Sequence, residues 1–303
     1  MIATIIVGYK NESLTTAYIQ QELSKLTVQN LVVVVNNVST PASCRYLETS
    51  VGACVVQSDF SGFQPDQPVY VIHVKENLGF AKANNLGVNF VRNFFPQVAY
   101  VLFSNNDIRI IDAQVVDVLI SKYESVKGIG IITPNILSAD GTRQTPMPAG
   151  SLWHGVRADL LYLLTHIRLK DHRAEACASA EEGFYDTFSE CFFLSRVQDY
   201  VACGMMDPHT FLYAEGNILS ERMSRIGLGY YFVPSVSVIH DNGTTTSQHI
   251  GPDTALLMAE SNAYYYKHYR GYSSLSVGIY LLLAKVMNRL AKAKQAFRAS
   301  RTS

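Results

Sequence analysis

Short apolar runs alternate with segments of helical length through the first half of this chain. The runs occupy residues 2–7, 31–35, 69–74, 100–103 and 130–133. Unbroken apolar runs are typical of parallel strands that are buried on both faces of a sheet. Residues 14–26, 80–95 and 112–123 lie between these runs and are long enough for helices. The order predicts an α/β fold with a doubly wound, mostly parallel sheet, which binds ligands at the carboxyl ends of its strands.

Composition excludes two classes of protein. Hydrophobic residues make up 48% of the 303 residues and charged residues 17%, so the chain is not intrinsically disordered. The 25 Lys and Arg residues balance the 25 Asp and Glu residues, and this lack of basic excess argues against a nucleic-acid partner. The charge is nevertheless uneven, because residues 285–303 contain six cations and no acid, so residues 1–284 carry a net charge of −6. The six cations are Lys285, Arg289, Lys292, Lys294, Arg298 and Arg301.

Cysteine usage and hydropathy indicate a cytoplasmic protein. The five cysteines are widely spaced and form no C-x-x-C pair, which argues against a zinc site or a disulfide framework. The N-terminus has no basic region followed by a cleavage site, so we interpret it as a core strand and not as a signal peptide. No run of about 18 apolar residues occurs, and we therefore expect no membrane span.

The second half of the chain is less regular. Residues 138–188 contain several prolines, histidines and arginines, which is typical of a long functional loop. The β pattern resumes at residues 191–195 and 230–240, and residues from Asp253 onward predict two helices.

Three polar clusters follow predicted strands. They begin at Asn36, Asn77 and Ser104 and read NNVS, NLGFAKANNLG and SNND. One such cluster alone is more often a turn or a helix cap than a site. Three clusters at the same edge of a parallel sheet favour a ligand crevice.

Six motifs in order resemble family 2 glycosyltransferases of the GT-A fold, in particular the bacterial rhamnosyltransferase-like branch that builds surface polysaccharides. They are TIIVGYKNE, VVVNNVST, NLGFAKANNLG, FSNNDIRI, GMMDPHTFLYAEGNIL and VSVIHDNGTT, and the overall likeness extends over about residues 2–246. The resemblance implies a GT-A domain over residues 1–250, with a Rossmann-like nucleotide-sugar-binding half (1–135) and an acceptor and catalytic half (136–250). Residues 251–303 would form a helical, basic extension.

The resemblance implies transfer of a sugar from a nucleotide diphosphate to an acceptor hydroxyl, assisted by Mn²⁺ or Mg²⁺, which neutralises the diphosphate. Asp107 stands at the family's D-x-D motif and is the expected metal carboxylate, with Asn105 in place of the first acid. His240 matches the family's late histidine and is expected to complete the metal site, which would suit Mn²⁺ better than Mg²⁺. The plain alternatives are a helix N-cap for Asp107 and a packing role for His240.

The same resemblance implies the residues of the nucleotide-sugar pocket. The family's Asp on the second strand is Asn36 here, and an Asn amide can both accept from and donate to a pyrimidine base, so a UDP- or dTDP-sugar is expected. Lys82 is either a phosphate ligand or a solvated helix lysine. The full set of expected nucleotide-sugar contacts is Gly8, Tyr9, Asn11, Glu12, Asn36, Asn37, Asn77, Gly79, Phe80, Asn84, Asn105 and Asn106.

The expected catalytic base is missing from its usual place. The family takes the base for an inverting displacement from the second acid of an E-D or E-E pair, and here the pair reads Glu215-Gly216. Glu215, Asp207 and Glu190 are the candidates that remain. One interpretation is an active enzyme. The alternative is a catalytically weak homologue that binds nucleotide sugar or scaffolds an assembly complex. A nucleotidyltransferase is disfavoured, because the chain has no early Gly- and Arg-rich phosphate loop.

The C-terminal extension combines an apolar helix, residues 275–290, with the six cations. This combination suits an anionic membrane surface, where lipid-linked glycan acceptors are made. We therefore expect peripheral attachment to the inner face of the cell membrane. The alternative is packing of this helix on the domain or against a second copy in a homodimer.

Overall fold

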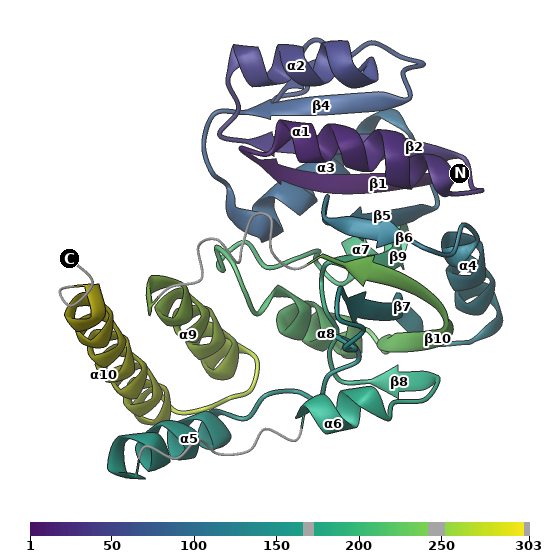
Figure 1. Ribbon diagram of the computed structural model, residues 1–303. Coiled ribbons are helices and arrows are strands. Elements are labelled where there is room, and N and C mark those ends of the chain that lie inside the picture. The colour runs from purple at the N-terminus through teal and green to yellow at the C-terminus, as the bar shows by residue number, and fades with distance from the viewer. Residues whose placement is uncertain (166–172, 242–251, 300–303) are drawn as a thin grey trace.

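A large mixed sheet forms the centre of the molecule (Figure 1). The computed structural model describes residues 1–165, 173–241 and 252–299. Within these residues the strands are β1 (Ile2–Tyr9), β2 (Asn30–Asn37), β3 (Cys54–Gln57), β4 (Val69–Val74), β5 (Tyr100–Ser104), β6 (Ile108–Ile110), β7 (Ile129–Ser138), β8 (Gly183–Tyr185), β9 (Phe192–Arg196) and β10 (Gly229–His240). The helices are α1 (Glu12–Ala17), continued by a π turn (Tyr18–Glu22) and a 3-10 turn (Leu23–Lys25), then α2 (Pro41–Val51), α3 (Gly79–Phe94), α4 (Val115–Ser125), α5 (Leu152–Thr165), α6 (Arg173–Ala178), α7 (Val197–Ala202), α8 (Glu215–Arg225), α9 (Pro252–His268) and α10 (Ser274–Ala299).

The strand order is β3-β4-β2-β1-β5-β9-β7-β10-β6, with β8 paired to β10. The first five strands of this order are parallel, and β9 is inserted antiparallel between β5 and β7. β10 runs parallel to β7 and antiparallel to β6. The predicted α/β sheet is confirmed, and its parallel part is the predicted first half.

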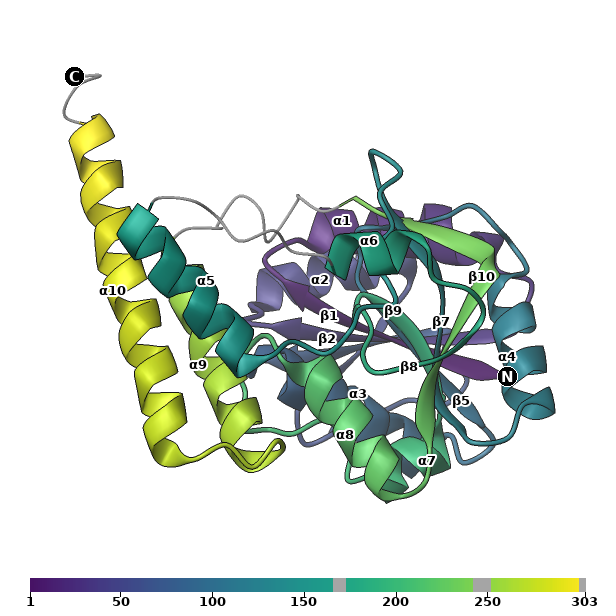
Figure 2. The same ribbon diagram turned by 90° about the horizontal axis from the view of Figure 1, so that it is seen from below.

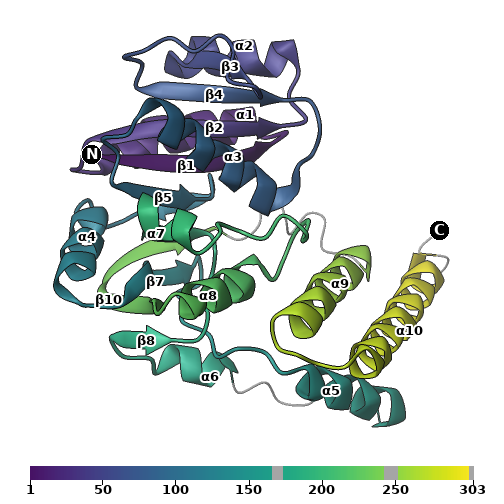
Figure 3. The same ribbon diagram turned by 180° about the vertical axis from the view of Figure 1, so that it is seen from behind.

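Helices cover both faces of the sheet, as a doubly wound fold requires. Side chains alternate across β1, so that Ile2 and Ile6 pack in one apolar cluster and Ala3 and Ile5 in another. The first cluster includes residues of α2 and α4, whereas the second includes residues of α3, α7 and α8. Figure 3 shows α3, α7 and α8 together on one face.

Two sequence expectations about secondary structure need correction. The predicted helix over residues 14–26 is helical but irregular, because a π turn and a 3-10 turn follow α1. The stretch 138–188 is not a plain loop, since it contains α5, α6 and β8. Pro146, Pro148 and Gly150 directly precede α5 and obscure its start in the sequence.

The helices α5, α9 and α10 stand beside the sheet as a separate layer (Figure 2). One apolar cluster joins Leu152 and Val156 of α5, Tyr266 of α9 and Val277 of α10 to Ile218 of α8. The expected extension 251–303 therefore shares its core with α5, which comes from the acceptor half, and with α8.

The helix α10 corrects the expectation that no segment could span a membrane. Ser274–Ala296 is long and apolar enough by length and composition, and only 11% of its apolar window is buried within the described residues. The sequence criterion required an uninterrupted apolar run. This helix contains cations, but its mean hydropathy is still high enough for a membrane-spanning helix. Length and composition alone do not show that the helix crosses a bilayer.

Candidate functional site

The polar clusters predicted from the sequence meet at one edge of the sheet. Gly8 and Tyr9 at the end of β1 pair with Asn36 and Asn37 at the end of β2. β5 lies on the other side of β1 and leads directly into Asn105. β10 brings its last residue to the same place, because His240 pairs with residue 108 of β6.

Asp107 and His240 form a buried pair. Asp107 Oδ1 lies 3.2 Å from His240 Nε2, and both side chains are about one-tenth exposed. The backbone N–H of Asp241 donates to the carbonyl of Asp107 at 3.0 Å, which fixes the two segments together. Asp107 is followed by β6, and the N-cap of α4 is Gln114, so the helix-cap alternative for Asp107 is excluded.

Gln144 orients the imidazole of His240. Its Oε1 lies 2.9 Å from His240 Nδ1. Burial alone would lower the pKa of His240, but the adjacent Asp107 carboxylate and the neighbouring Cys191 outweigh burial and raise the pKa to about 10. The paired arrangement therefore favours a proton, or another cation, between the imidazole and the carboxylate.

The pair fits a divalent cation as two ligands of an incomplete shell. Asp107 Oδ1 is buried and has no partner of hydrogen-bonding geometry among the described residues, so it is available to a cation. A carboxylate with an imidazole is a suitable donor set for Mn²⁺. The described residues contain no group of three or more His, Cys, Asp or Glu residues that could hold a metal, so a bound diphosphate or water would have to supply the remaining ligands.

A network of amides shapes the loop after β1. Asn106 Nδ2 donates to Thr15 Oγ1 at 2.8 Å, and Asn11 Nδ2 donates to Asn106 Oδ1 at 3.3 Å. The backbone N–H of Tyr9 donates to Asn11 Oδ1 at 3.1 Å. The expected residues Tyr9, Asn11 and Asn106 are thus brought together, and Thr15 is a member that the sequence did not single out.

The glycine at position 8 lies beside the side-chain oxygens of Asn36 and Asn11. A Cβ there would lie 3.5 Å from Asn36 Oδ1 and 3.6 Å from Asn11 Oδ1, so a longer side chain would fill the space between these amides. Next to it, Tyr9 and Lys10 are exposed, with Lys10 Nζ 5.3 Å from the centre of the Tyr9 ring. Glu12 begins α1 and is partly exposed.

The side chains of Asn36 and Asn37 mainly make hydrogen bonds that stabilise the neighbouring segments of the chain. Asn36 is only 2% exposed and donates from Nδ2 to Ser43 Oγ at 3.3 Å. Asn37 Oδ1 accepts from the backbone N–H of Leu78 at 3.4 Å, which ties β2 to the NLGF loop. The side-chain oxygen of Asn36 lies 3.5 Å from the position that a Cβ on Gly8 would occupy.

The NLGF loop also has a structural role. Gly79 has a φ of +75°, and a Cβ there would lie 2.3 Å from the carbonyl oxygen of Phe211. That carbonyl accepts from the backbone N–H of Phe80 at 3.0 Å, so the loop holds the segment that leads to α8. The close approach that requires glycine is therefore made to Phe211 of the same chain. Asn77 is exposed at the start of this loop, and its Oδ1 accepts from the N–H of Gly79.

The expected nucleotide contact of Asn84 is wrong. Asn84 is 1% exposed and donates to the carbonyl of Phe80 at 3.0 Å within its own helix. A side chain with no access to solvent and its amide turned to the helix backbone cannot reach a ligand at the sheet edge. Lys82, by contrast, is exposed on α3, as a solvated lysine would be.

Asp207 is a structural anchor and a poor candidate for the base. Its oxygens accept from Tyr269 Oη at 2.5 Å and Tyr264 Oη at 3.0 Å, and the Arg222 guanidinium lies 3.2 Å away. Burial would raise the pKa of Asp207, but these hydrogen bonds and those from His209 hold it well below its usual range. A carboxylate that already accepts several hydrogen bonds binds a proton weakly. Asp207 instead connects α9 to α8 through Tyr264 and Arg222.

Glu190 and Glu215 lie together at the start of α8. Glu190 Oε1 accepts from the backbone N–H of Gly216 at 2.5 Å. Burial raises the pKa of both carboxyls, and the neighbouring Glu190 charge contributes to raising that of Glu215 to about 8. Glu215 is 3% exposed, and its Oε1 has no hydrogen-bond partner among the described residues.

A turn with unfavourable backbone angles lies directly before Glu215. Tyr213 and Ala214 both have positive φ values, of 76° and 66°, immediately before Glu215. Two successive non-glycine residues in the left-handed region cost of order 1–3 kcal/mol each and cluster at functional sites. Glu190 is also held near the end of β5. The carbonyl of the next residue, Cys191, accepts from the N–H of Asn105 at 2.8 Å.

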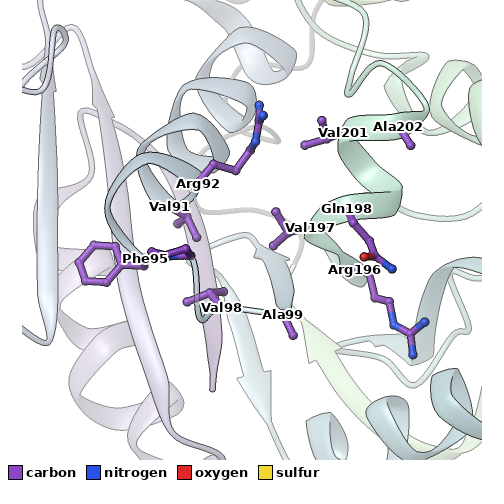
Figure 4. Close-up of a pocket in the computed structure, with 11 residues that line it drawn as sticks. Val91, Arg92, Phe95, Val98, Ala99, Arg196, Val197, Gln198, Val201 and Ala202 are labelled. Carbon is purple, nitrogen blue, oxygen red and sulfur yellow. The ribbon is translucent and has the colours of Figure 1, made fainter.

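A cavity lies elsewhere in the molecule (Figure 4). It has a volume of about 680 Å³ and lies between the end of α3, the start of β5 and α7. Arg92 and Arg196 are among its lining residues. It opens at the amino end of β5, opposite Asn105, and is therefore separate from the polar edge.

Comparison with known proteins supports the fold. No family model matches the chain, and a search of the curated proteins finds no match. A mannosyltransferase from Pyrobaculum calidifontis, solved with GDP-Man and Mn²⁺, is 12% identical with a TM-score of 0.57, and the match covers 97% of this chain and 74% of that one. GalNAc-T7, solved with UDP, GalNAc and Mn²⁺, is 13% identical with a TM-score of 0.58, and the match covers 89% of this chain and 49% of that one.

A third similar structure is TarS (residues 1–349) from S. aureus, at 13% identity and a TM-score of 0.50, with coverage of 89% of this chain and 73% of that one. These similarities confirm the predicted GT-A fold. Identities of this size show a common fold, and the activity has to be argued from the site.

Proposed function

We propose that the protein is a metal-dependent, inverting glycosyltransferase. It would move a hexose or a deoxyhexose such as rhamnose from a UDP- or dTDP-sugar to a lipid-linked glycan in bacterial surface polysaccharide synthesis. The observation that carries the proposal is the Asp107–His240 pair, which lies at the carboxyl edge of a GT-A sheet beside the pocket of Gly8 and Asn36. The similar structures, one solved with GDP-Man and Mn²⁺ and one with UDP, GalNAc and Mn²⁺, support a nucleotide-sugar donor and a divalent metal.

In this proposal separate groups of residues at the sheet edge bind the metal and the nucleoside. Asp107 and His240 hold Mn²⁺ or Mg²⁺, which supplies charge neutralisation for the diphosphate leaving group. The amides around Gly8 hold the nucleoside, and the exposed ring of Tyr9 can stack on its base. The oxygen of Asn36 beside Gly8 can accept an N–H of the base, and the family resemblance at this position is the reason for proposing a pyrimidine donor, a UDP- or dTDP-sugar.

A ligand panel tests this function directly. UDP-, dTDP- and GDP-sugars are scored by thermal shift with and without Mn²⁺, and the binders are then tested for transfer to extracted lipid-linked glycans. We expect a Mn²⁺-dependent shift with a pyrimidine donor, followed by transfer. Asp107→Ala should abolish the Mn²⁺-dependent part of the shift, while Asp117→Ala on α4 serves as the matched control. Full Mn²⁺-dependent binding by Asp107→Ala would refute the metal assignment.

The second candidate is a homologue that binds nucleotide sugar or scaffolds an assembly complex and has little transfer activity. Its support is Gly216, which replaces the acid that the family uses as the base. Donor binding without transfer or hydrolysis under all acceptor conditions would favour this candidate.

We further propose that the protein acts at the inner face of the cell membrane, held by α10. Leu275, Ile279, Leu282 and Leu290 lie on one stripe of this helix and are exposed by 76%, 38%, 63% and 51%. Lys285 and Arg289 are exposed on the same helix. An apolar stripe with flanking cations suits the surface of an anionic bilayer.

Vesicle sedimentation of the full chain tests the attachment. Binding to vesicles that contain phosphatidylglycerol should exceed binding to phosphatidylcholine alone, and Leu275→Ser/Leu282→Ser should reduce it. Tyr46→Ser, at an exposed position on α2, is the control. Unchanged vesicle binding by the double variant would contradict the proposal. A dimer detected by light scattering and lost in the double variant would show that a second copy covers the stripe instead.

A further inference from the structure

Glu190 occupies the space in which a side chain of residue 216 would begin. A Cβ built on Gly216 would lie 2.5 Å from Glu190 Oε1 and 2.8 Å from its Cδ. Carbon and oxygen atoms without a bond between them cannot approach so closely, so a side chain at 216 would require the Glu190 carboxyl to leave its present position. In this structure the carboxyl of Glu190 therefore lies where a side chain at position 216, the place of the missing acid, would begin.

The position of Glu190 is fixed by the start of α8. The first N–H groups of a helix have no partner within the helix, and Ala214, the N-cap of α8, provides no side-chain cap. Glu190 Oε1 accepts one of these N–H groups, that of Gly216. Burial raises the pKa of Glu190, whereas the hydrogen bond and the positive end of the helix dipole favour its ionised form and oppose the effect of burial.

Glu215 is unsuited to the same task. It is 3% exposed, whereas Glu190 is partly exposed, and an acceptor hydroxyl must reach the base. With a pKa of about 8, Glu215 keeps its proton at neutral pH. Its charge would also oppose that of Glu190, so one proton on the pair is the favoured state and Glu215 holds it.

We propose that Glu190 is the general base of the transfer reaction and that its carboxylate replaces the acid missing from position 216. The inference rests on the proposed function. Glu190 takes the proton of the acceptor hydroxyl as that oxygen forms a bond to the anomeric carbon of the donor sugar. The bond from this carbon to the diphosphate oxygen breaks, and its electron pair leaves with the nucleoside diphosphate. The proton ends on Glu190, and the sugar is inverted.

The variant Glu190→Gln distinguishes a role of Glu190 as the general base from a role as the cap of α8. Glu190→Gln retains an amide oxygen that can accept from Gly216, so the thermal unfolding temperature and the KM for the donor should stay close to wild type. The kcat should fall by roughly 10²–10⁴-fold, which is the usual contribution of a positioned base. The ascending acid limb of the pH profile of kcat/KM should disappear. If Glu190 only capped α8, kcat and the pH profile would stay unchanged, and this result would overturn the inference.

A second variant moves the acid back to position 216. Glu190→Gly/Gly216→Asp places a carboxyl on the α8 side of the same space and should recover part of the lost kcat, whereas Glu190→Gly/Gly216→Asn should not. Gly216→Asp alone should displace Glu190 and break its hydrogen bond to the backbone N–H of residue 216, so kcat should fall while Glu190 is still present. Wild-type kcat in Gly216→Asp would contradict the requirement for Glu190 in its present position.

The outcomes distinguish this inference from the proposed function. Wild-type transfer with unchanged activity in Glu190→Gln overturns the choice of base alone. A wild-type protein that binds donor and Mn²⁺ but transfers nothing overturns the proposed function, and the base assignment with it.

Discussion

The buried carboxyl of Glu215 should make the stability of the protein fall with rising pH. The pKa of Glu215 in the folded protein is about 8, raised mainly by burial and also by the charge of Glu190. Between the ordinary pKa of a glutamate and about 8, the folded state holds a proton that the unfolded state has released. Each increase in pH within this window therefore favours unfolding. Below the window both states are protonated, and above it both are ionised. Glu215→Gln removes the titrating group and should remove this part of the dependence.

The size of the effect follows from the two pKa values. The difference between the ordinary value of 4.5 and about 8 corresponds to about 5 kcal/mol, at about 1.4 kcal/mol for each pH unit. Glu215 is only 3% exposed, so solvent screening reduces this value little. The free energy of unfolding of Glu215→Gln, relative to wild type, should therefore rise by several kcal/mol between pH 4.5 and pH 9.

Urea unfolding at a series of pH values measures this difference. Wild type and Glu215→Gln are compared at each pH, so that titrating groups distant from Glu215 largely cancel, and the difference reports Glu215 together with its coupling to Glu190. Glu48→Gln, at an exposed position on α2, is the control and should run parallel to wild type. A relative change below about 1 kcal/mol for Glu215→Gln would refute the reasoning, because it would mean that the folded protein leaves Glu215 accessible to water or paired with a cation.

The parts of the fold that the sequence predicted are those determined by local pattern. The apolar runs became β1, β2, β4, β5 and part of β7, because burial on both faces requires an unbroken apolar run. The helix α5 was missed, because its apolar side chains pack on α10, far along the chain. A helix that depends on a distant partner leaves only a weak local signal.

At the site, too, local motifs predicted some residues and missed those that depend on contacts distant in the sequence. Asp107 and His240 were predicted as a pair through their motifs, and the structure brings them within 3.2 Å of one another. Asn84 was predicted from a motif as well, but it faces its own helix, because a motif does not show whether a residue contacts a ligand or supports the fold. Gln144 lies in an irregular segment and carries no sequence signal. The contact between the Glu190 carboxyl and Gly216 joins residues 26 positions apart and could be found only in three dimensions.

Three further variants test the supporting structure of the site. Gly79→Ala should destabilise the protein by several kcal/mol in urea unfolding, because its Cβ would meet the Phe211 carbonyl and its φ is +75°; stability equal to wild type would show that the loop can move. Asp207→Asn should lower stability by roughly 3–5 kcal/mol, since it breaks a buried network, and should leave donor binding by the folded protein unchanged in calorimetry. Gln144→Ala removes the acceptor that orients His240, so the affinity for Mn²⁺ should fall by roughly 10–100-fold while Gln144→Glu retains it. Electron paramagnetic resonance of free Mn²⁺ measures this affinity, and equal affinities of Gln144→Ala and wild type would mean that His240 either needs no orientation or is not a ligand.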